Sequence, residues 1–239
     1  MEYRVRSSLA RLGAPRADLV LLHWDDLAAR GPRGAGYTDA ALWLADLQGK
    51  GLARGVGLTN FDSPSLLRVL DAGMPCAAHE VAYSVADRRP QLFVADVCAR
   101  RNIPLLAYGV MAGGLLSDRL RGVPASKVSL DTPSRQHHGG WFQQAGGWQW
   151  VQDMLEALHT VGERHGVTGS AVALRWVLQQ PGVAAAVVGA RNANHVRSLQ
   201  QAFTFSLGEE DLLDINAAYE GATRHPTTDV FVWERGGAF

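Results

Sequence analysis

The chain has 239 residues, of which 47% are hydrophobic and 19% charged, a composition typical of a globular domain with a sizeable core. Its 23 Lys and Arg residues balance 23 Asp and Glu residues, so the net charge gives no reason to expect nucleic acid or a membrane surface as a partner. No apolar run approaches the ~20 residues needed to cross a bilayer. Cys76 and Cys98 form no CxxC pair. We therefore expect a cytoplasmic protein without a disulfide or a metal site.

Strands and helices are predicted to alternate along the chain. The first apolar run, DLVLLHW at 18–24, ends on a histidine, a tryptophan and two acids. Four more apolar runs predict strands at 54–59, 77–82, 103–108 and 183–189. Apolar residues at helical spacing, with capping residues and closing glycines, predict helices at 4–12, 38–50, 63–72, 90–102, 149–165, 169–179, 193–203 and 209–219. The segment 111–145 is predicted to be irregular.

The predicted strands end in polar or glycine-rich residues. These ends read HWDD, TNFD, AYSVAD, YGVMAGG and GARN in chain order. Strands that are apolar throughout and separated by helices predict a parallel sheet covered on both faces. The carboxyl ends of such strands are where α/β barrels and open α/β sheets bind ligands. The histidine and acids that close the first strand are therefore expected to lie at the ligand-binding edge of the sheet.

Four segments together resemble successive landmarks of the aldo-keto reductase family. They are SSLARLGAPRADLVLLHW, GVGLTNF, LLAYGVMAGGLLS and SAVALRWVLQQPGVAAAVVGARN, in the correct order and at the expected spacing. The segment from TPSRQHHGG to GERHGV resembles the connection before the last barrel strand in the branch found in plants, algae and fungi. The resemblance implies a (β/α)8 TIM barrel, NADP(H) as cofactor, and reversible reduction of a small aldehyde or ketone to an alcohol.

The resemblance also assigns the carbonyl site. His23 matches the histidine that orients the carbonyl through a hydrogen bond, and Trp24 would line the substrate pocket. The family's catalytic aspartate, tyrosine and lysine come from its first three strand and helix units, which have no counterpart here. We therefore expect an incomplete barrel, with strands 4 to 8 and their helices present and strands 1 to 3 absent. It would form one domain over 1–239, the C-terminal five-eighths of the family's domain.

The cofactor residues follow from the same resemblance. Thr59 and Asn60 match the pair that holds the nicotinamide amide. Glu80 stands where the family has a glutamine, and a carboxylate accepts hydrogen bonds but cannot donate them. The remaining expected cofactor contacts are the stacking residue Tyr108, then Gly109, Ala112 and Gly113 near the pyrophosphate, and Gly189, Ala190 and Arg191 near the adenosine 2′-phosphate. His195 stands where this branch usually has a glutamine, on the adenine side of the site.

Three hypotheses stay open for the function. In the first hypothesis, the chain is part of an NADPH-dependent carbonyl reductase whose N-terminal part is absent from the gene model, and the isolated chain is inactive. Alternatively, it is a catalytically inactive binding or scaffold module that keeps part of the dinucleotide site. In the third, subunits self-associate and complete each other's sheets through exposed strand edges. An open doubly wound sheet is disfavoured because no G-x-G-x-x-G turn is present. The adjacent His137 and His138 have no Cys or carboxylate at ligand spacing, so we expect them to lie in a loop and not to form a metal site.

Overall fold

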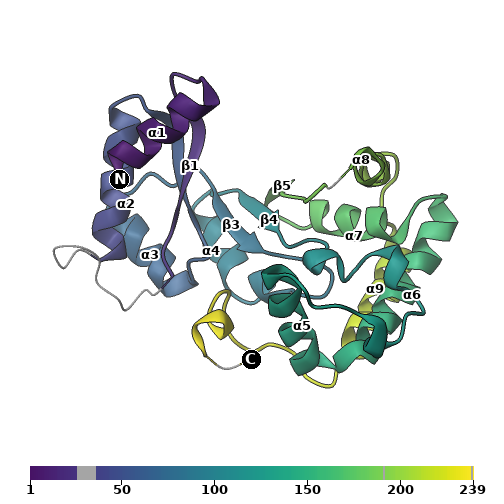
Figure 1. Ribbon diagram of the computed structural model, residues 1–239. Coiled ribbons are helices and arrows are strands. Elements are labelled where there is room, and N and C mark those ends of the chain that lie inside the picture. The colour runs from purple at the N-terminus through teal and green to yellow at the C-terminus, as the bar shows by residue number, and fades with distance from the viewer. Residues whose placement is uncertain (26–35, 191, 238) are drawn as a thin grey trace. The chain divides into compact units, whose positions relative to one another are not determined.

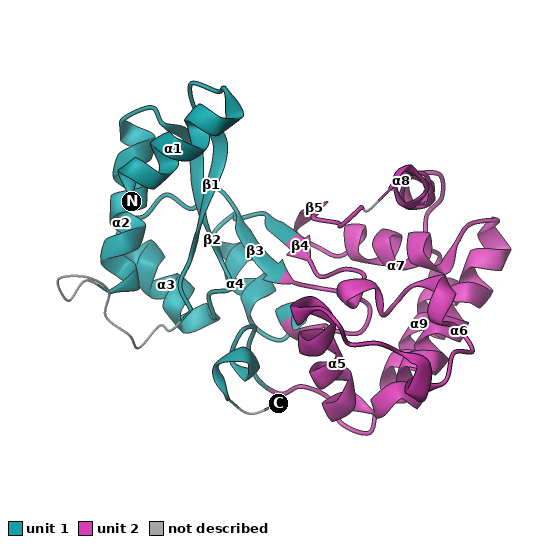
Figure 2. Ribbon diagram, viewed as in Figure 1, with its two compact units in different colours: residues 1–81, 90–106, 228–238 teal, residues 82–89, 107–227, 239 magenta. Residues whose placement is uncertain are grey.

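The computed structural model describes residues 1–25, 36–190, 192–237 and 239. These residues form two compact units (Figure 2). Unit 1 comprises residues 1–81, 90–106 and 228–238, and unit 2 comprises residues 82–89, 107–227 and 239. Two strands run from one unit into the other, and each unit is described by itself below.

The helices and strands follow chain order (Figure 1). Unit 1 holds α1 (Glu2–Leu12), β1 (Ala17–His23), α2 (Tyr37–Gly49), β2 (Ala53–Thr59), α3 (Ser63–Asp71) and α4 (Val94–Arg100). Strands β3 (His79–Ala82) and β4 (Leu105–Tyr108) begin in unit 1 and end in unit 2. Unit 2 holds α5 (Pro133–Ala145), α6 (Gly147–His165), α7 (Gly169–Leu178), β5 (Val183–Ala186), α8 (Ala193–Gln200) and α9 (Glu209–Glu220). Short 3-10 turns lie at Arg89–Gln91, Ala112–Gly114, Asp118–Leu120, Ala125–Lys127, Gln201–Phe203 and Trp233–Arg235.

The strands pair in chain order, β1-β2-β3-β4-β5. Strand β1 is parallel to β2, with His23 opposite Thr59, and β2 is parallel to β3, with Thr59 opposite Glu80. The five predicted strands are therefore confirmed. The core of unit 1 forms where α2 packs against β1, β2 and α3, and its buried side chains include Leu44, Leu47, Val56, Leu58, Leu66 and Val69. In unit 2, helix α6 packs against α5, α7 and α9.

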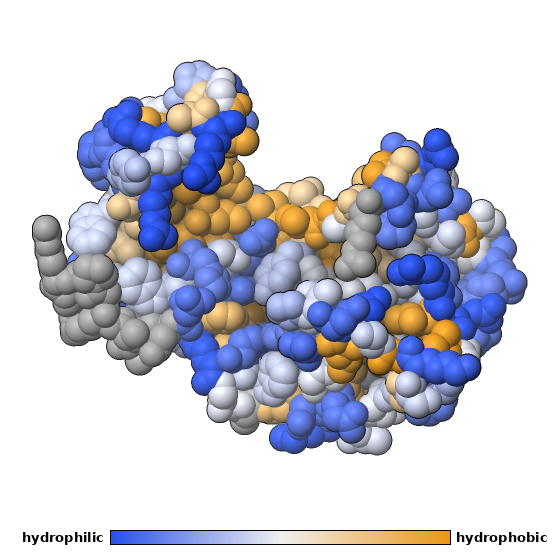
Figure 3. All heavy atoms as spheres, viewed as in Figure 1, coloured by the Kyte–Doolittle hydropathy of each residue, from blue (hydrophilic) through white to orange (hydrophobic). Residues whose placement is uncertain are grey.

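Strand β1 is less buried than β2. Leu22 is buried, whereas Leu19, Val20 and Leu21 are half-buried. Figure 3 shows hydrophobic side chains over the strands of unit 1 and hydrophilic side chains over α1. In unit 2, Val187 and Val188 after β5 are exposed.

The predicted helices are present within a few residues of their expected bounds, with two exceptions. The run expected at 90–102 divides into a 3-10 turn and the shorter α4, which begins at Val94. The segment expected to be irregular contains α5, which starts with Thr132 as cap and Pro133 in the first helical position. Polar residues and the Gly139-Gly140 pair concealed this helix because they break the apolar spacing. His137 and His138 therefore lie in a helix and not in a loop.

A buried carboxylate joins α6 to α9 in unit 2. Asp211 is 5% exposed and accepts a hydrogen bond from the backbone N–H of Gly208 (3.0 Å). Its carboxylate also accepts from Arg164 Nη1 (2.9 Å) and lies 2.8 Å from His165 Nε2. Burial alone raises the pKa of the Asp211 carboxyl, but the hydrogen bonds from Gly208, His165 and Arg164 outweigh burial and hold that pKa below its usual value.

Asp211→Asn is expected to lower the free energy of unfolding at pH 7 by about 1–3 kcal/mol. A carboxyl whose folded-state pKa is depressed contributes stability above its unfolded pKa and loses that contribution as the pH falls through its folded pKa. The difference between wild type and variant should therefore narrow as the pH falls below about 4. Urea unfolding at pH 7 and pH 3 measures the free energies of wild type and variant. An equal difference between the two proteins at both pH values would contradict the depressed pKa of Asp211.

Candidate functional site

The carboxyl ends of β1, β2 and β3 bring three predicted site residues into one row in unit 1. The register places His23 opposite Thr59 and Thr59 opposite Glu80. Residues in one row of parallel strands point to the same face of the sheet. Thr59 Oγ1 donates a hydrogen bond to Glu80 Oε2 (2.9 Å), and both residues are half-buried. We call His23, Thr59 and Glu80 the rim row.

His23 lies at the exposed end of the rim row. Its Nδ1 is 3.2 Å from Asp25 Oδ1, a carboxylate that is 93% exposed. The imidazole meets the ring of Phe231 edge to face, with centroids 5.5 Å apart. Trp24, the predicted substrate contact, follows β1 and is half-buried. An exposed imidazole at a strand end is available to hydrogen-bond a ligand oxygen.

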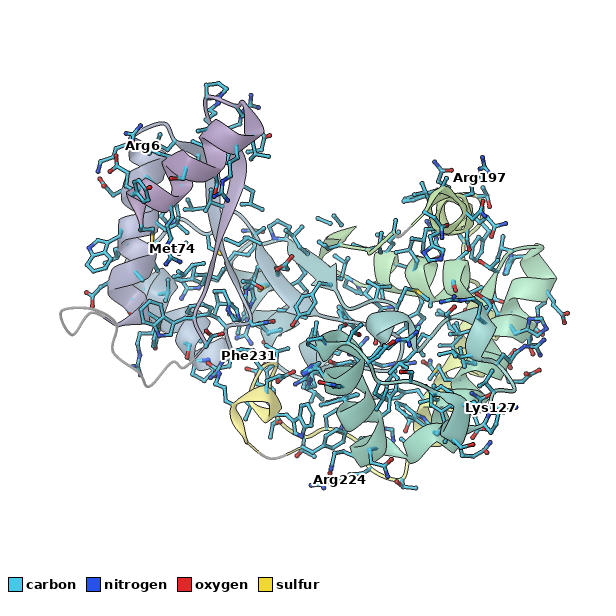
Figure 4. All side chains as sticks on the ribbon, viewed as in Figure 1. Arg6, Met74, Lys127, Arg197, Arg224 and Phe231 are labelled. Carbon is cyan, nitrogen blue, oxygen red and sulfur yellow. The ribbon has the colours of Figure 1, made fainter. Side chains whose placement is uncertain are left out.

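The C-terminal segment of unit 1 packs against this end of the sheet. Phe231, labelled in Figure 4, has a φ of +63°, a left-handed conformation unusual for an aromatic residue. The guanidinium of Arg235 lies 4.7 Å from its ring and donates to Asp62 Oδ2 (2.7 Å) and to the backbone oxygen of Asn60 (3.4 Å). The sequence carried no signal for Phe231 or Arg235, because their partners are distant in the chain. Asp62 and Asn60, which Arg235 contacts, lie more than 170 positions before it.

The turn after β2 is supported from inside unit 1. Asn60 has a φ of +59°, which asparagine tolerates better than most residues. His79 is fully buried, with Nε2 2.9 Å from the backbone oxygen of Phe61 and Nδ1 3.2 Å from that of Leu58. Burial lowers the pKa of the His79 imidazole and favours the neutral ring. His79 thus supports the backbone that carries Thr59 and Asn60.

The third predicted strand end, AYSVAD, does not expose its aspartate. Asp87 is bound by Arg89 through two hydrogen bonds, and both side chains are buried. The neighbouring Arg88 guanidinium lies 3.9 Å from the ring centre of Tyr219 and 4.5 Å from that of Trp176. All of these residues belong to unit 2. The polar character of this segment therefore reflects packing inside unit 2 and not ligand binding.

A pocket of about 360 Å³ lies within unit 2. The glycine-rich turn at Gly113 and Gly114 lines it, as do Gly189 from the loop after β5 and His195 from α8. Gly113 and Gly114 have φ values of +65° and +87°, which only glycine adopts freely. The structure therefore brings together Gly113, Gly189 and His195 from the predicted cofactor residues. Tyr108, Gly109, Ala112 and Ala190 belong to the same unit but do not line the pocket, and Arg191 lies outside the described residues.

Two arginines that sequence reasoning missed also line this pocket. Arg135 Nη1 donates to the backbone oxygen of Ser129 (2.9 Å), and Arg119 forms no ion pair within the described ranges. Asp118 lines the pocket as well, and its carboxylate accepts from the N–H groups of Gly169 and Ser170, so it caps α7. Guanidinium groups, serine hydroxyls and glycine backbone form a donor set that suits phosphate oxygens. The two arginines therefore make phosphate oxygens a suitable ligand group for this pocket, in which the Asp118 carboxylate is already bound by the start of α7.

Three comparisons relate the chain to known proteins. The model of the Aldo/keto reductase family matches residues 1–220. The chain is 25% identical to Aldo-keto reductase YhdN of Bacillus subtilis over 95% of this chain and 66% of that protein. It is 26% identical to the NADH-specific methylglyoxal reductase of Escherichia coli over 87% of this chain and 60% of that protein. Flagellar radial spoke protein 5 of Chlamydomonas reinhardtii is 35% identical, over 52% of this chain and 24% of its own length.

Solved structures share the fold. A glycerol dehydrogenase from Gluconobacter oxydans matches with a TM-score of 0.76 at 23% identity, over 95% of this chain and 65% of that chain. An aldo/keto reductase from Klebsiella pneumoniae in complex with NADP and acetate matches with a TM-score of 0.67 at 24% identity, over 96% of this chain and 68% of that chain. The chain thus spans about two thirds of the length of the structures it matches.

These matches correct the predicted fold class. We expected an incomplete barrel without strands 1 to 3, but the family match begins at residue 1 and extends to residue 220. The solved relatives cover 95–96% of the chain. The fold is accordingly assigned as the (β/α)8 fold of this family, and the prediction of a barrel that lacks strands 1 to 3 is wrong. The prediction numbered the strands from local motifs, and a motif reports the chemistry at a strand end rather than the place of that strand in a barrel.

Proposed function

Because the chain belongs to the aldo/keto reductase family, we propose that it is an NADP(H)-dependent oxidoreductase that reduces an aldehyde or ketone to an alcohol. The observation that carries this proposal is the pocket in unit 2, where Arg119, Arg135 and a glycine turn present donors for phosphate. Support for the cofactor also comes from a Klebsiella pneumoniae aldo-keto reductase in complex with NADPH, 25% identical to this chain. The adenosine 2′-phosphate of NADP(H) is anionic and is bound best by cationic side chains, and Arg119 and Arg135 line this pocket.

The roles proposed for individual residues follow the family resemblance. The bound cofactor would supply the hydride for the carbonyl carbon, and the alcohol oxygen would take its proton from solvent. His23 hydrogen-bonds the carbonyl oxygen, and Trp24 lines the substrate side. Thr59, Asn60 and Glu80 hold the nicotinamide amide. The other proposed cofactor contacts are Tyr108, Gly109, Ala112, Gly113, Gly189, Ala190, Arg191 and His195.

Arg119→Met tests the phosphate pocket. Removal of one charge-assisted contact is expected to raise the Kd for NADPH by about tenfold or more. The affinity should also become less sensitive to salt, because one fewer cation faces the ligand. Titration of the tryptophan fluorescence with NADPH at two salt concentrations measures both effects.

The matched control is Arg121→Met. Arg121 lies two residues away, does not line the pocket, and donates to Glu156 Oε2 (3.0 Å). Its replacement should leave the Kd within about twofold, since an exposed ion pair contributes little. Equal losses for the two variants would show that general surface charge, and not this pocket, binds the cofactor. Absence of saturable NADPH binding to the wild-type chain would reject the proposed function.

A second candidate is a catalytically inactive binding or scaffold module. The algal radial spoke protein favours it, since its name denotes a component of the flagellum and its identity to this chain is 35% over the matched half. A carbonyl turnover assay on the NADPH-bound protein separates the candidates. Turnover supports the oxidoreductase, and saturable binding without turnover supports the module.

Several finer assignments accompany the proposal. We propose one aldo-keto reductase-like domain over residues 1–239, a cytoplasmic location, and a place in the branch found in plants, algae and fungi. Relatives from Chlamydomonas reinhardtii and Arabidopsis thaliana support that branch, although bacterial relatives match as well. Self-association through the exposed edge of β1 is a further proposal, which light scattering tests. No helix within the described part of the chain has the length and apolarity to cross a membrane.

A further inference from the structure

Two residues of the rim row, Thr59 and Glu80, present acceptors and a negative charge to a ligand. The hydroxyl hydrogen of Thr59 is used on Glu80 Oε2 (2.9 Å), so towards any ligand the Thr59 oxygen can only accept. Glu80 accepts hydrogen bonds through both carboxylate oxygens and donates none when ionised. A ligand group that carries N–H donors or a positive charge therefore suits this part of the row.

Among the described residues, Glu80 forms no ion pair with a cationic side chain. Glu80 is half-buried, and none of the ion pairs of those residues includes it. The guanidinium of Arg235, which reaches the neighbouring Asn60 backbone oxygen, forms its ion pair with Asp62 at 2.7 Å. Asp25, beside His23, adds a second carboxylate, although it is 93% exposed and well screened. A half-buried charge is screened less by water and salt than an exposed one.

We propose that Glu80 makes the rim row select the oxidised form of the nicotinamide cofactor. This inference rests on the proposed function, which assigns Glu80 to the nicotinamide side. The oxidised nicotinamide ring carries a positive charge and the reduced ring is neutral, so a nearby carboxylate stabilises the oxidised form more. A neutral amide of the same shape would not distinguish the two forms by charge.

The selection favours binding of the cofactor form that takes part in the reverse of the proposed reduction. At equal free concentrations of the two cofactor forms, more of the protein is loaded with the oxidised form, which accepts a hydride. The alcohol carbon then gives up one hydrogen with two electrons, and the hydroxyl proton leaves to solvent, so that a carbonyl and the reduced cofactor result. The substrate class in that direction is an alcohol, and Glu80 is the specificity-determining residue for the cofactor's redox state.

The test compares NADP⁺ and NADPH binding to the wild-type chain and to Glu80→Gln. Both dissociation constants are measured by isothermal titration calorimetry, which requires no turnover. The ratio of the Kd for NADP⁺ to the Kd for NADPH is expected to rise about tenfold in Glu80→Gln. Glutamine keeps an acceptor for the Thr59 hydroxyl, and an unchanged melting temperature confirms that the variant is folded.

Asp25→Asn is the matched control, because it removes an exposed carboxylate next to the same row. Its ratio should stay within about twofold of the wild-type value. If both cofactor forms bind and the ratio is unchanged in Glu80→Gln, the proposed function survives and the selectivity of Glu80 is refuted. If neither form binds to the wild-type chain, the proposed function fails and this inference fails with it.

Discussion

Replacement of Arg89 by methionine is expected to lower the free energy of unfolding by about 3–5 kcal/mol. Arg89 and Asp87 form an ion pair whose side chains are 1% and 6% exposed. Two hydrogen bonds join them, from Nε to Oδ1 (2.9 Å) and from Nη2 to Oδ2 (2.7 Å). The guanidinium also lies 4.1 Å from the ring centre of Trp141. The variant leaves a buried carboxylate without its cation, which is far more costly than the loss of the contact itself.

Two controls isolate this effect. Arg100→Met breaks an ion pair with Asp96 whose side chains are 73% and 59% exposed, and should cost less than about 1 kcal/mol. The double variant Asp87→Leu with Arg89→Met removes both charges and should recover much of the lost stability, because no unpaired charge stays buried. Urea denaturation of the three variants gives the free energies. A loss below 1 kcal/mol for Arg89→Met would show that water reaches the pair.

Gly57→Val is expected to cost about 3 kcal/mol or more, or to prevent folding of unit 1. Gly57 lies in β2 between β1 and β3. A Cβ atom there would stand 2.2 Å from the backbone oxygen of Ala78 and 2.8 Å from Leu21 Cδ2. The first contact involves backbone, so a rotamer change cannot relieve it, and the strands themselves would have to separate.

Gly49→Ala is the matched control within the same unit. Gly49 lies in the last turn of α2, and its added Cβ would meet nothing within 4 Å. Alanine should therefore stabilise the helix by about 0.5–1 kcal/mol. Thermal unfolding of the two variants measures the opposite shifts. A valine at position 57 with wild-type stability would contradict the close approach of β2 to its neighbours.

Local patterns were enough for most of the secondary structure. Each strand is a short apolar run, and a helix such as α3 shows its own start in Asp62, Ser63 and Pro64. These signals lie within a few residues of one another, so the sequence shows them directly. Helix α5 was not predicted because its glycines and polar residues interrupt the helical spacing of apolar residues. Packing of the buried Trp141 and Phe142 stabilises it instead.

The candidate site divides in the same way. The sequence by itself determined the family, the strands and the residues at their carboxyl ends, since motif order and apolar runs are properties of neighbouring residues. Only the tertiary structure decided that Thr59 hydrogen-bonds Glu80, that Asp87 is buried with Arg89, and that Arg119 and Arg135 line one pocket. Charge and hydrogen-bonding capacity belong to a residue, whereas burial and partnership depend on which distant segments the fold brings into contact.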